Sequence, residues 1–481
     1  MKKAAVIIFV VFAIIYCSVS LVNHYFFRTH AHDLGINNNA IYDYAHLRWN
    51  DCMVMQPQFR NILSDHFTIY PILISPLYWI FGSYTMLIFQ IAAILFGGWG
   101  ILKLLRLKFG ELSWIPLAGV IHFFSFYGIF SALAFDYHDN VVAAMFVPWL
   151  FYFYEKKNYR LFYLFLILIL IGKENMALWS IFIALGLLAL NTNDKIKIKH
   201  ASLAASISFI CFIAIISWII PSLANENRAY LHFNYDALGG TAGEALTFMI
   251  KHPQKTFAYL IENHTQDGYG YLMKAETYYM LLLSGGFVAI IRPQYLLMIL
   301  PVLGQKMLNN DIIKWGVGAH YSIEFAPVIS VALFTWIYHL NLNEKKKTVV
   351  ACCLTALCIS AAVTVFDNRF AKWYDTTNAK FYDAKHWKSN FDVRELNQAL
   401  KLIPDDANVS AQSEVLPHVA FRQVIYLFPR IADAEYVVLL NNENYYPTNR
   451  EGYEKKIGEL KTSPQWDLIY DMNMTMIFKR R

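Results

Sequence analysis

Several apolar runs in this chain approach the roughly 20 residues that an α-helix needs to cross a bilayer, and they restrict its fold more than any other feature. Hydrophobic residues make up 57% of the 481 residues, whereas charged residues make up 16%. The full-length runs are about 4–24, 84–106, 112–131, 201–221, 320–340 and 348–366. The shorter or interrupted runs are about 67–81, 140–154, 160–190, 277–291 and 295–308. The sequence therefore predicts a mainly α-helical, polytopic integral membrane protein.

Basic residues lie in short clusters between the runs, so the net charge of +6 reports orientation in the membrane rather than nucleic-acid binding. The segment 66–82 is short for a span and contains Pro71 and Pro76, so we interpret it as a re-entrant or interfacial helix on the outer side. With this interpretation the basic clusters all become cytoplasmic. About eleven spans follow, and they place the N-terminus in the cytoplasm and the C-terminus outside the cell (inner) membrane.

The chain is predicted to have a transmembrane domain, residues 1–366 with a first outer loop at 28–83, and a soluble extracytoplasmic domain, residues 367–481. In the tail, "VRELNQALKLIP" has helical spacing, "QVIYLFP" and "AEYVVLL" are typical of buried strands, and "LIYDMNMTMIFK" predicts a hairpin turning at residues 472–473. This pattern predicts a small α/β fold. The run 160–190 is too long for one helix and is predicted to be two helices joined at 172–175.

Five of the six cysteines lie inside apolar runs, and only Cys52 lies in a loop. This distribution argues against a disulfide framework and against a cysteine metal site. No Gly-rich nucleotide cradle is present, which disfavours a soluble nucleotide-sugar as substrate.

The outer connections carry ionisable and aromatic side chains close to the hydrocarbon. They are Asp33, Asp65, His66, Asp136, Tyr137, His138, Asp139, Lys173, Glu174, His320 and Tyr321. Charges at such positions are costly, so they are paired, exposed to water or functional. Each also has a structural alternative: Asp65 and His66 could cap the adjacent helix. Lys173 and Glu174 could form a local ion pair, and His320 could anchor the chain at the interface. Because separate connections contribute these groups, the pattern favours a reaction centre at the outer surface, with a substrate whose apolar part stays in the bilayer.

At these residues the sequence resembles a known family. The segments "HDLGINNNAIYDYAH", "SDHFTIYPILISPLYWIFG", "FDYHDN", "GKEN" and "AHYSIEFAP" resemble bacterial membrane proteins of domain-of-unknown-function family 2079, DUF2079. The tail also resembles the outer domain of that family, so the resemblance covers nearly the whole chain. Two positions depart from the usual pattern, because His32 replaces Phe and Asn39 replaces Gln. The family is similar in layout to the GT-C superfamily of polyprenyl-phosphate-dependent glycosyltransferases.

This resemblance implies an activity and a site. GT-C enzymes carry an acidic residue in the first outer loop, which Asp33 matches, and often a second in the next outer loop, which Asp136 or Asp139 matches. Asp33 would act as the general base, or would help to hold a divalent metal together with Asp136. No other cofactor is implied. The groups implied for substrate and phosphate binding are Asp65, His66, Asp136, His138, Asp139, Lys173, Glu174, His320 and Tyr321.

The implied donor is a polyprenyl-phosphate-linked sugar, and the implied acceptor is an extracytoplasmic lipid, glycan or protein. Two other functions remain open. The chain could be a non-catalytic binding or transport protein for lipid-linked saccharides, or a membrane scaffold for its outer domain. Loss of activity in Asp33→Asn with unchanged lipid binding would favour the enzyme, whereas transport that survives this substitution would favour the carrier.

Overall fold

The computed structural model describes residues 1–55, 61–224, 232–367, 369, 371 and 377–481. The parts of the predicted outer loops at 56–60 and 225–231 lie outside the described residues. The chain divides into two compact units. Unit 1 comprises Met1–Tyr16, Gln90–Trp218 and Arg228–Lys380, and unit 2 comprises Cys17–Phe89, Ile219–Asn227 and Phe381–Arg481. The first outer loop therefore belongs to the same compact unit as the tail, while the domain boundary between 366 and 367 stays a prediction.

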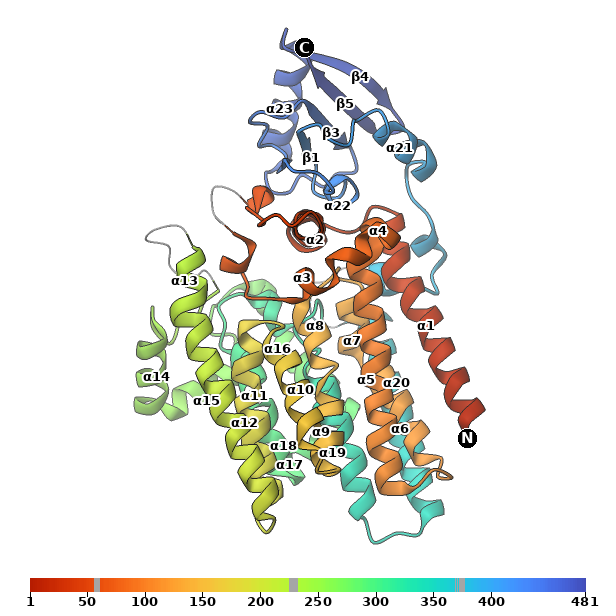
Figure 1. The fold of residues 1–481 in the computed structure, drawn as a ribbon, viewed down its shortest axis with the longest axis vertical. Helices are drawn as coiled ribbons and strands as arrows, with labels where there is room; N and C mark the ends of the chain where they lie inside the picture. Colours follow the sequence, from red (N-terminus) through yellow and green to blue (C-terminus); the bar gives the residue numbers. More distant parts are fainter. Residues whose placement is uncertain (56–60, 225–231, 368, 370, 372–376) are drawn as a thin grey trace. The chain divides into compact units, whose positions relative to one another are not determined.

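Unit 1 is built from helices (Figure 1). The helices α1 (Lys2–Tyr25) and α5 (Thr85–Phe109) have residues in both units. The other helices of unit 1 are α6 (Ile115–Phe124), α7 (Tyr127–Leu133), α8 (Asp139–Ala144), α9 (Val147–Glu155), α10 (Tyr159–Leu170), α11 (Glu174–Leu190), α12 (Lys195–Ala214), α14 (Ala242–Lys251), α15 (Pro253–Ile261), α16 (Met273–Leu281), α17 (Phe287–Ile291), α18 (Pro293–Met307), α19 (Phe325–His339) and α20 (Glu344–Asp367).

The predicted number of about eleven spans is wrong by the criterion of helix length. Among the described residues, four helical stretches are long and apolar enough to cross a membrane, namely Lys2–Tyr25, Tyr70–Phe109, Lys195–Leu223 and Glu344–Asp367. A fifth is reached if α6 and α7, which meet at 41°, count as one broken span. The other apolar runs are divided into helices that are shorter than a full span, such as α19 with 15 residues. Hydropathy detects a continuous apolar run but not the point at which its helix breaks.

The predicted division of the run 160–190 into two helices is confirmed. Helix α10 has 12 residues and α11 has 17. Asn158 caps α10 by accepting a hydrogen bond from the backbone N–H of Leu161 at 3.3 Å. A turn at residues 171–172 ends α10, and Lys173 then precedes α11 in an extended conformation.

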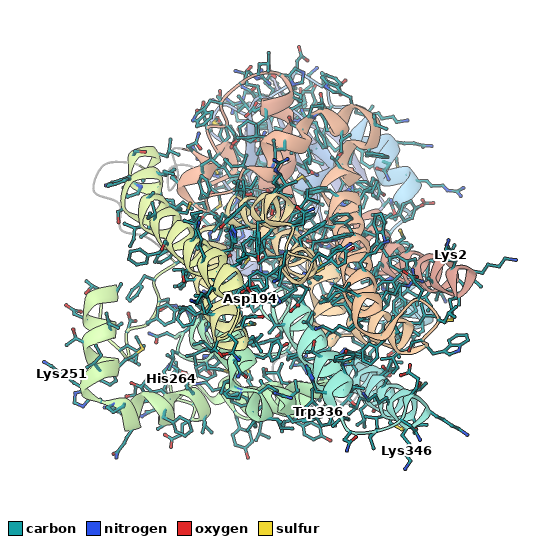
Figure 2. All side chains as sticks on the ribbon, turned by 60° about the horizontal axis from the view of Figure 1, so that its bottom comes forward. Lys2, Asp194, Lys251, His264, Trp336 and Lys346 are labelled. Carbon is teal, nitrogen blue, oxygen red and sulfur yellow. The ribbon has the colours of Figure 1, made fainter. Side chains whose placement is uncertain are left out.

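Basic connections gather at one end of the helices of unit 1. In Figure 1 the N-terminus and the connections α11–α12 and α19–α20 lie at this end. Figure 2, in which this end comes forward, labels Lys2 near the start of α1 and Lys346 near the start of α20. The grouping agrees with the charge pattern that the sequence assigns to one side of the membrane.

Unit 2 contains a five-stranded sheet of order β2-β1-β3-β5-β4. Its strands are β1 (Val409–Ala411), β2 (Ile425–Leu427), β3 (Tyr436–Leu440), β4 (Trp466–Met472) and β5 (Thr475–Arg480). Its helices are α2 (Ile36–Ala45), α3 (Tyr70–Ile74), α4 (Tyr78–Phe81), α13 (Ile220–Leu223), α21 (Val393–Leu400), α22 (Leu416–Val419) and α23 (Arg450–Thr462). Strand β1 pairs in parallel with β2 and β3, whereas β5 pairs antiparallel with β3 and β4. The predicted helix, the two predicted strands and the predicted hairpin are confirmed, while β1 and α23 were not predicted.

Both faces of the sheet are buried along β1, β2 and β3, whereas β4 is largely exposed. Along β3, Val438 belongs to a core cluster that also contains Ala31 from the first outer loop. The neighbouring Val437 points to the opposite face, as strand geometry requires, and packs in a cluster with Tyr453 and Leu460 of α23. The first outer loop thus completes one hydrophobic core of the tail.

The segment 66–82 consists of short helical pieces. Helices α3 and α4 have five and four residues, and a 3₁₀ turn that contains Pro76 separates them. Gly82 follows with φ of 54°, a conformation that glycine adopts at little cost. Helix α5 alone has 25 residues, enough for the span that starts in this region. That the segment does not cross the membrane stays a prediction.

Labelling of single cysteines tests this prediction. In a variant without the native cysteines, Leu47→Cys and Phe81→Cys should react with a membrane-impermeant maleimide in intact cells, because Leu47 precedes the segment 66–82, Phe81 lies near its end, and the whole segment stays on the outer side. Leu112→Cys, which follows α5, should react only after permeabilisation. Leu47 and Leu112 are suitable positions because their side chains are 97% and 86% exposed. If Leu112→Cys labels in intact cells together with Leu47→Cys, and Phe81→Cys labels only after permeabilisation, the segment 66–82 crosses the membrane.

Candidate functional site

Two buried asparagines fix the first outer loop against the tail within unit 2. The side-chain amide of Asn38 donates to the backbone carbonyl of Pro417 at 3.0 Å. The amide of Asn39 donates to the carbonyls of Ala420 at 3.2 Å and Arg422 at 3.0 Å. A buried amide without such partners would be costly, so these bonds determine where the loop lies. We call this set of hydrogen bonds the amide clamp.

The predicted catalytic residue, Asp33, lies just before the amide clamp in a short π-helix, η1 (Ala31–Gly35). It is half-buried, and its charge acts on two histidines that precede it, His30 and His32. Burial lowers the pKa of His30 and of His32, and the negative charge of Asp33 partly opposes both shifts. His32 shares a hydrogen bond of 2.8 Å between its Nδ1 and the hydroxyl of Tyr446. The carboxylate therefore lies beside imidazoles that are neutral near pH 7.

Asp65 belongs to the same neighbourhood of unit 2. Its negative charge acts on His32, as that of Asp33 does. Its side chain is buried, and that of His66 is half-buried. Neither residue is the N-cap of α3, which is Ile69. Unit 2 therefore brings together two predicted carboxylates, and carboxylate oxygens are ligands that Mg²⁺ and Ca²⁺ prefer.

In unit 1, Gln90 fixes the predicted segment 136–139. Its side-chain amide donates to the carbonyl of Asp136 at 2.9 Å, and its side-chain oxygen accepts from the backbone N–H of His138 at 2.9 Å. Asp136 has φ of 72°, and the two bonds stabilise this left-handed conformation. The hydroxyl of Tyr137 donates to the carboxylate of Asp139 at 2.7 Å. All these side chains are buried.

The segments "FDYHDN" and "AHYSIEFAP" meet in unit 1. The rings of His138 and His320 stack with centroids 3.7 Å apart, and the ring centroids of His320 and Tyr321 lie 4.2 Å apart. Asn140 donates to the carboxylate of Glu324 at 2.8 Å. Three predicted site residues thus lie together.

Lys173 approaches the same region from a third predicted segment. Its positive charge acts on Glu324. It also acts on Lys314, whose pKa is lowered chiefly by burial. Glu174 is buried in the first turn of α11, where its negative charge interacts favourably with the helix dipole.

Sequence reasoning missed several charged groups of unit 1. Arg369 forms a fork with Glu276, whose carboxylate oxygens lie 2.6–2.9 Å from the guanidinium nitrogens, and both side chains are almost fully buried. Lys306 is also buried and donates to the carbonyl of Gly316. The available signal was the presence of Glu276 and Lys306 in or beside apolar runs, where ionisable residues are rare.

The predicted convergence of Asp33 with Asp136, His138, Glu174 and His320 joins residues of the two units, and it stays a prediction. That Asp33 and Asp136 bind one metal ion also stays a prediction.

A comparison with protein families finds a match to the family described as "Predicted membrane protein (DUF2079)" over residues 23–473. No curated protein matches the chain significantly.

Gln90→Leu tests the role of Gln90. The substitution leaves the carbonyl of Asp136 and the N–H of His138 without the partner that they have now, and each buried polar group left unpaired costs about 1–3 kcal/mol. We expect a lower midpoint of thermal unfolding in detergent. Gln398→Leu, on an exposed face of α21, should leave the midpoint unchanged. Equal midpoints for Gln90→Leu and the parent would show that these hydrogen bonds contribute nothing.

Proposed function

The chain belongs to the DUF2079 family of predicted membrane proteins, whose model matches residues 23–473, and from this premise we propose that it is a membrane glycosyltransferase. It transfers a sugar from a polyprenyl-phosphate donor to an extracytoplasmic acceptor, which is a lipid, a glycan or a protein. Apolar helices long enough to cross a membrane place the protein in the bilayer, which also holds the prenyl tail of the donor. The similarity of the family's layout to GT-C enzymes supports this reaction class.

The environment of Asp33 is the observation that carries the proposal. The half-buried carboxylate of Asp33 lies shortly beyond the first apolar helix, beside the imidazoles of His30 and His32. Burial lowers the pKa of both histidines. A general base needs a carboxylate or imidazole held in one position, and the amide clamp holds the adjacent segment. This environment supports the proposal that Asp33 is the general base.

The proposed reaction is a direct displacement with inversion. An acceptor hydroxyl attacks the anomeric carbon and forms the new glycosidic C–O bond. The bond between the anomeric carbon and the phosphate oxygen breaks, and polyprenyl phosphate leaves with the electron pair. Asp33 accepts the hydroxyl proton. Lys173, His66 and His320 offset the negative charge of the leaving phosphate.

The remaining predicted residues position the donor. We propose that Asp136, His138 and Asp139 contact the sugar. We propose donor binding also for Glu174 and Tyr321 of unit 1 and for Asp65 of unit 2. A divalent cation held by Asp33 and Asp136 would supply further positive charge for the phosphate, and carboxylate oxygens suit such an ion.

We further propose that the N-terminus is cytoplasmic and that the tail lies outside the inner membrane. An alkaline phosphatase fused after Arg481 should then be active, because this enzyme folds only in an oxidising compartment. A fusion after Leu112 should be inactive. An active fusion at Leu112 together with an inactive one at Arg481 would reverse the proposed orientation.

Asp33→Asn tests the proposed chemistry. The variant should express and insert normally, yet transfer sugar about 10²–10⁴-fold more slowly, because it lacks the base. The measurement is transfer of radiolabelled sugar from polyprenyl-phosphate donors in membranes. Asp51→Asn, an exposed residue of the same loop, is the matched control and should keep the parental rate. Transfer by Asp33→Asn at the parental rate would refute the role of Asp33, and transport of lipid-linked saccharide without transfer by either protein would favour a carrier.

A further inference from the structure

The carboxyl ends of β1 and β3 lie at the same edge of the sheet in unit 2, because these strands pair in parallel. The segment 412–414 follows β1, and the segment 441–446 follows β3. In open sheets with parallel strands, ligands bind outside the carboxyl ends of the strands. This edge is therefore the place in unit 2 where topology favours a ligand.

A network of amides joins the two segments. The side-chain nitrogen of Gln412 donates to the side-chain oxygen of Asn442 at 3.1 Å and to the backbone carbonyl of Asn444 at 2.9 Å. The side-chain nitrogen of Asn444 donates to Oε1 of Glu414 at 3.0 Å. These bonds fix the orientation of the Gln412 amide, because a flipped amide would direct its oxygen at the carbonyl of Asn444, which cannot donate.

Two acceptors of this network have no hydrogen-bond donor among the described residues. They are Oε1 of Gln412 and Oε2 of Glu414, and both atoms are buried. The side chain of Gln412 is fully buried. Burial raises the pKa of Glu414 to about 7, against the hydrogen bond from Asn444 and the positive charge of Arg28. Buried acceptors of this kind are normally satisfied, so the pair points to donors that a ligand supplies.

An aromatic side chain, Tyr446, extends the same edge. Tyr446 is 50% exposed, and its backbone N–H donates to the side-chain oxygen of Asn444 at 3.2 Å. Its hydroxyl contacts His32, the neighbour of Asp33. A half-exposed tyrosine offers an apolar face on which a sugar ring can pack, while the two acceptors suit hydroxyl groups. A calcium ion is a poorer match, because such sites use several charged oxygens and this network contains one carboxylate.

We propose that the segments after β1 and β3 form a carbohydrate-binding site, in which Gln412 and Glu414 accept hydrogen bonds from sugar hydroxyls and Tyr446 packs against the ring. The contacts from Glu414 through Asn444 and Tyr446 to His32 connect this site to the neighbourhood of Asp33. The bound sugar is the acceptor, or the acceptor end of a longer glycan. The role of the bound sugar as acceptor rests on the proposed function. Sugar binding itself does not, because it does not require transfer.

Hydrogen–deuterium exchange of the full chain in nanodiscs tests the site without any substitution. The probes are glucose, galactose, mannose and N-acetylglucosamine, each without donor lipid. At least one should slow exchange in the segments 412–416 and 441–447. If no sugar protects these segments, or if calcium alone does, the proposal is overturned, because water or a cation then satisfies the two acceptors.

A pair of matched variants gives a second measurement. Glu414→Gln keeps one acceptor oxygen and replaces the other with a donor, so the affinity for the protecting sugar should fall about tenfold or more. Glu443→Gln, an exposed residue of the same edge, should bind as the parent does. Equal affinities of parent and Glu414→Gln would refute the contact. Asp33→Asn should bind sugar as the parent does. If the parent binds sugar but transfers none, the proposed function is refuted while the carbohydrate-binding site stands.

Discussion

The amide clamp is the interaction on which the arrangement of unit 2 depends. It ties α2 to the carbonyls around α22, and η1 with Asp33 directly precedes α2. A rotation of α2 by one residue, about 100°, would remove Asn38 and Asn39 from their partners and leave buried amides unsatisfied. The approach is also close, because a Cβ atom at Gly35 would lie 2.6 Å from a methyl group of Leu416. The clamp therefore fixes the direction in which the first-loop carboxylate can act.

The elements of the tail could be predicted where an apolar pattern was present. The helix at 393–400 has apolar residues at helical spacing, β2 and β3 are continuous apolar runs typical of buried strands, and the hairpin of β4 and β5 is indicated by its turn. Strand β1 has only three residues, too few to define a period, and α23 contains many charged residues around two buried ones, Tyr453 and Leu460. In unit 1 the break between α6 and α7 falls inside a continuous apolar run, so hydropathy gave no signal of it.

The candidate site was predictable in its residue types but not in its pairings. A carboxylate or histidine near hydrocarbon can be recognised from one sequence, because its burial is costly. Its partner cannot be recognised when it comes from a distant segment. Gln90 contacts His138, and Glu276 contacts Arg369, only because the helices pack as they do. The sequence likewise does not indicate the partners of Asn38 and Asn39, which lie in the tail about 380 residues further along the chain.

The amides of Asn39 and Gln412 have different roles in unit 2, and the bonding of the amide oxygen separates them. The side-chain nitrogen of Asn39 binds two backbone carbonyls and its oxygen accepts from the side chain of Asn50, so this residue holds segments together. The nitrogen of Gln412 does the same for the edge of the sheet, but this bonding directs its oxygen to a place where the described residues offer no donor. A side chain whose donor half is fully used and whose acceptor half is not has a fixed orientation and an unused bonding capacity. That combination is what a preorganised binding site requires, since the ligand then does not have to order the group that it contacts.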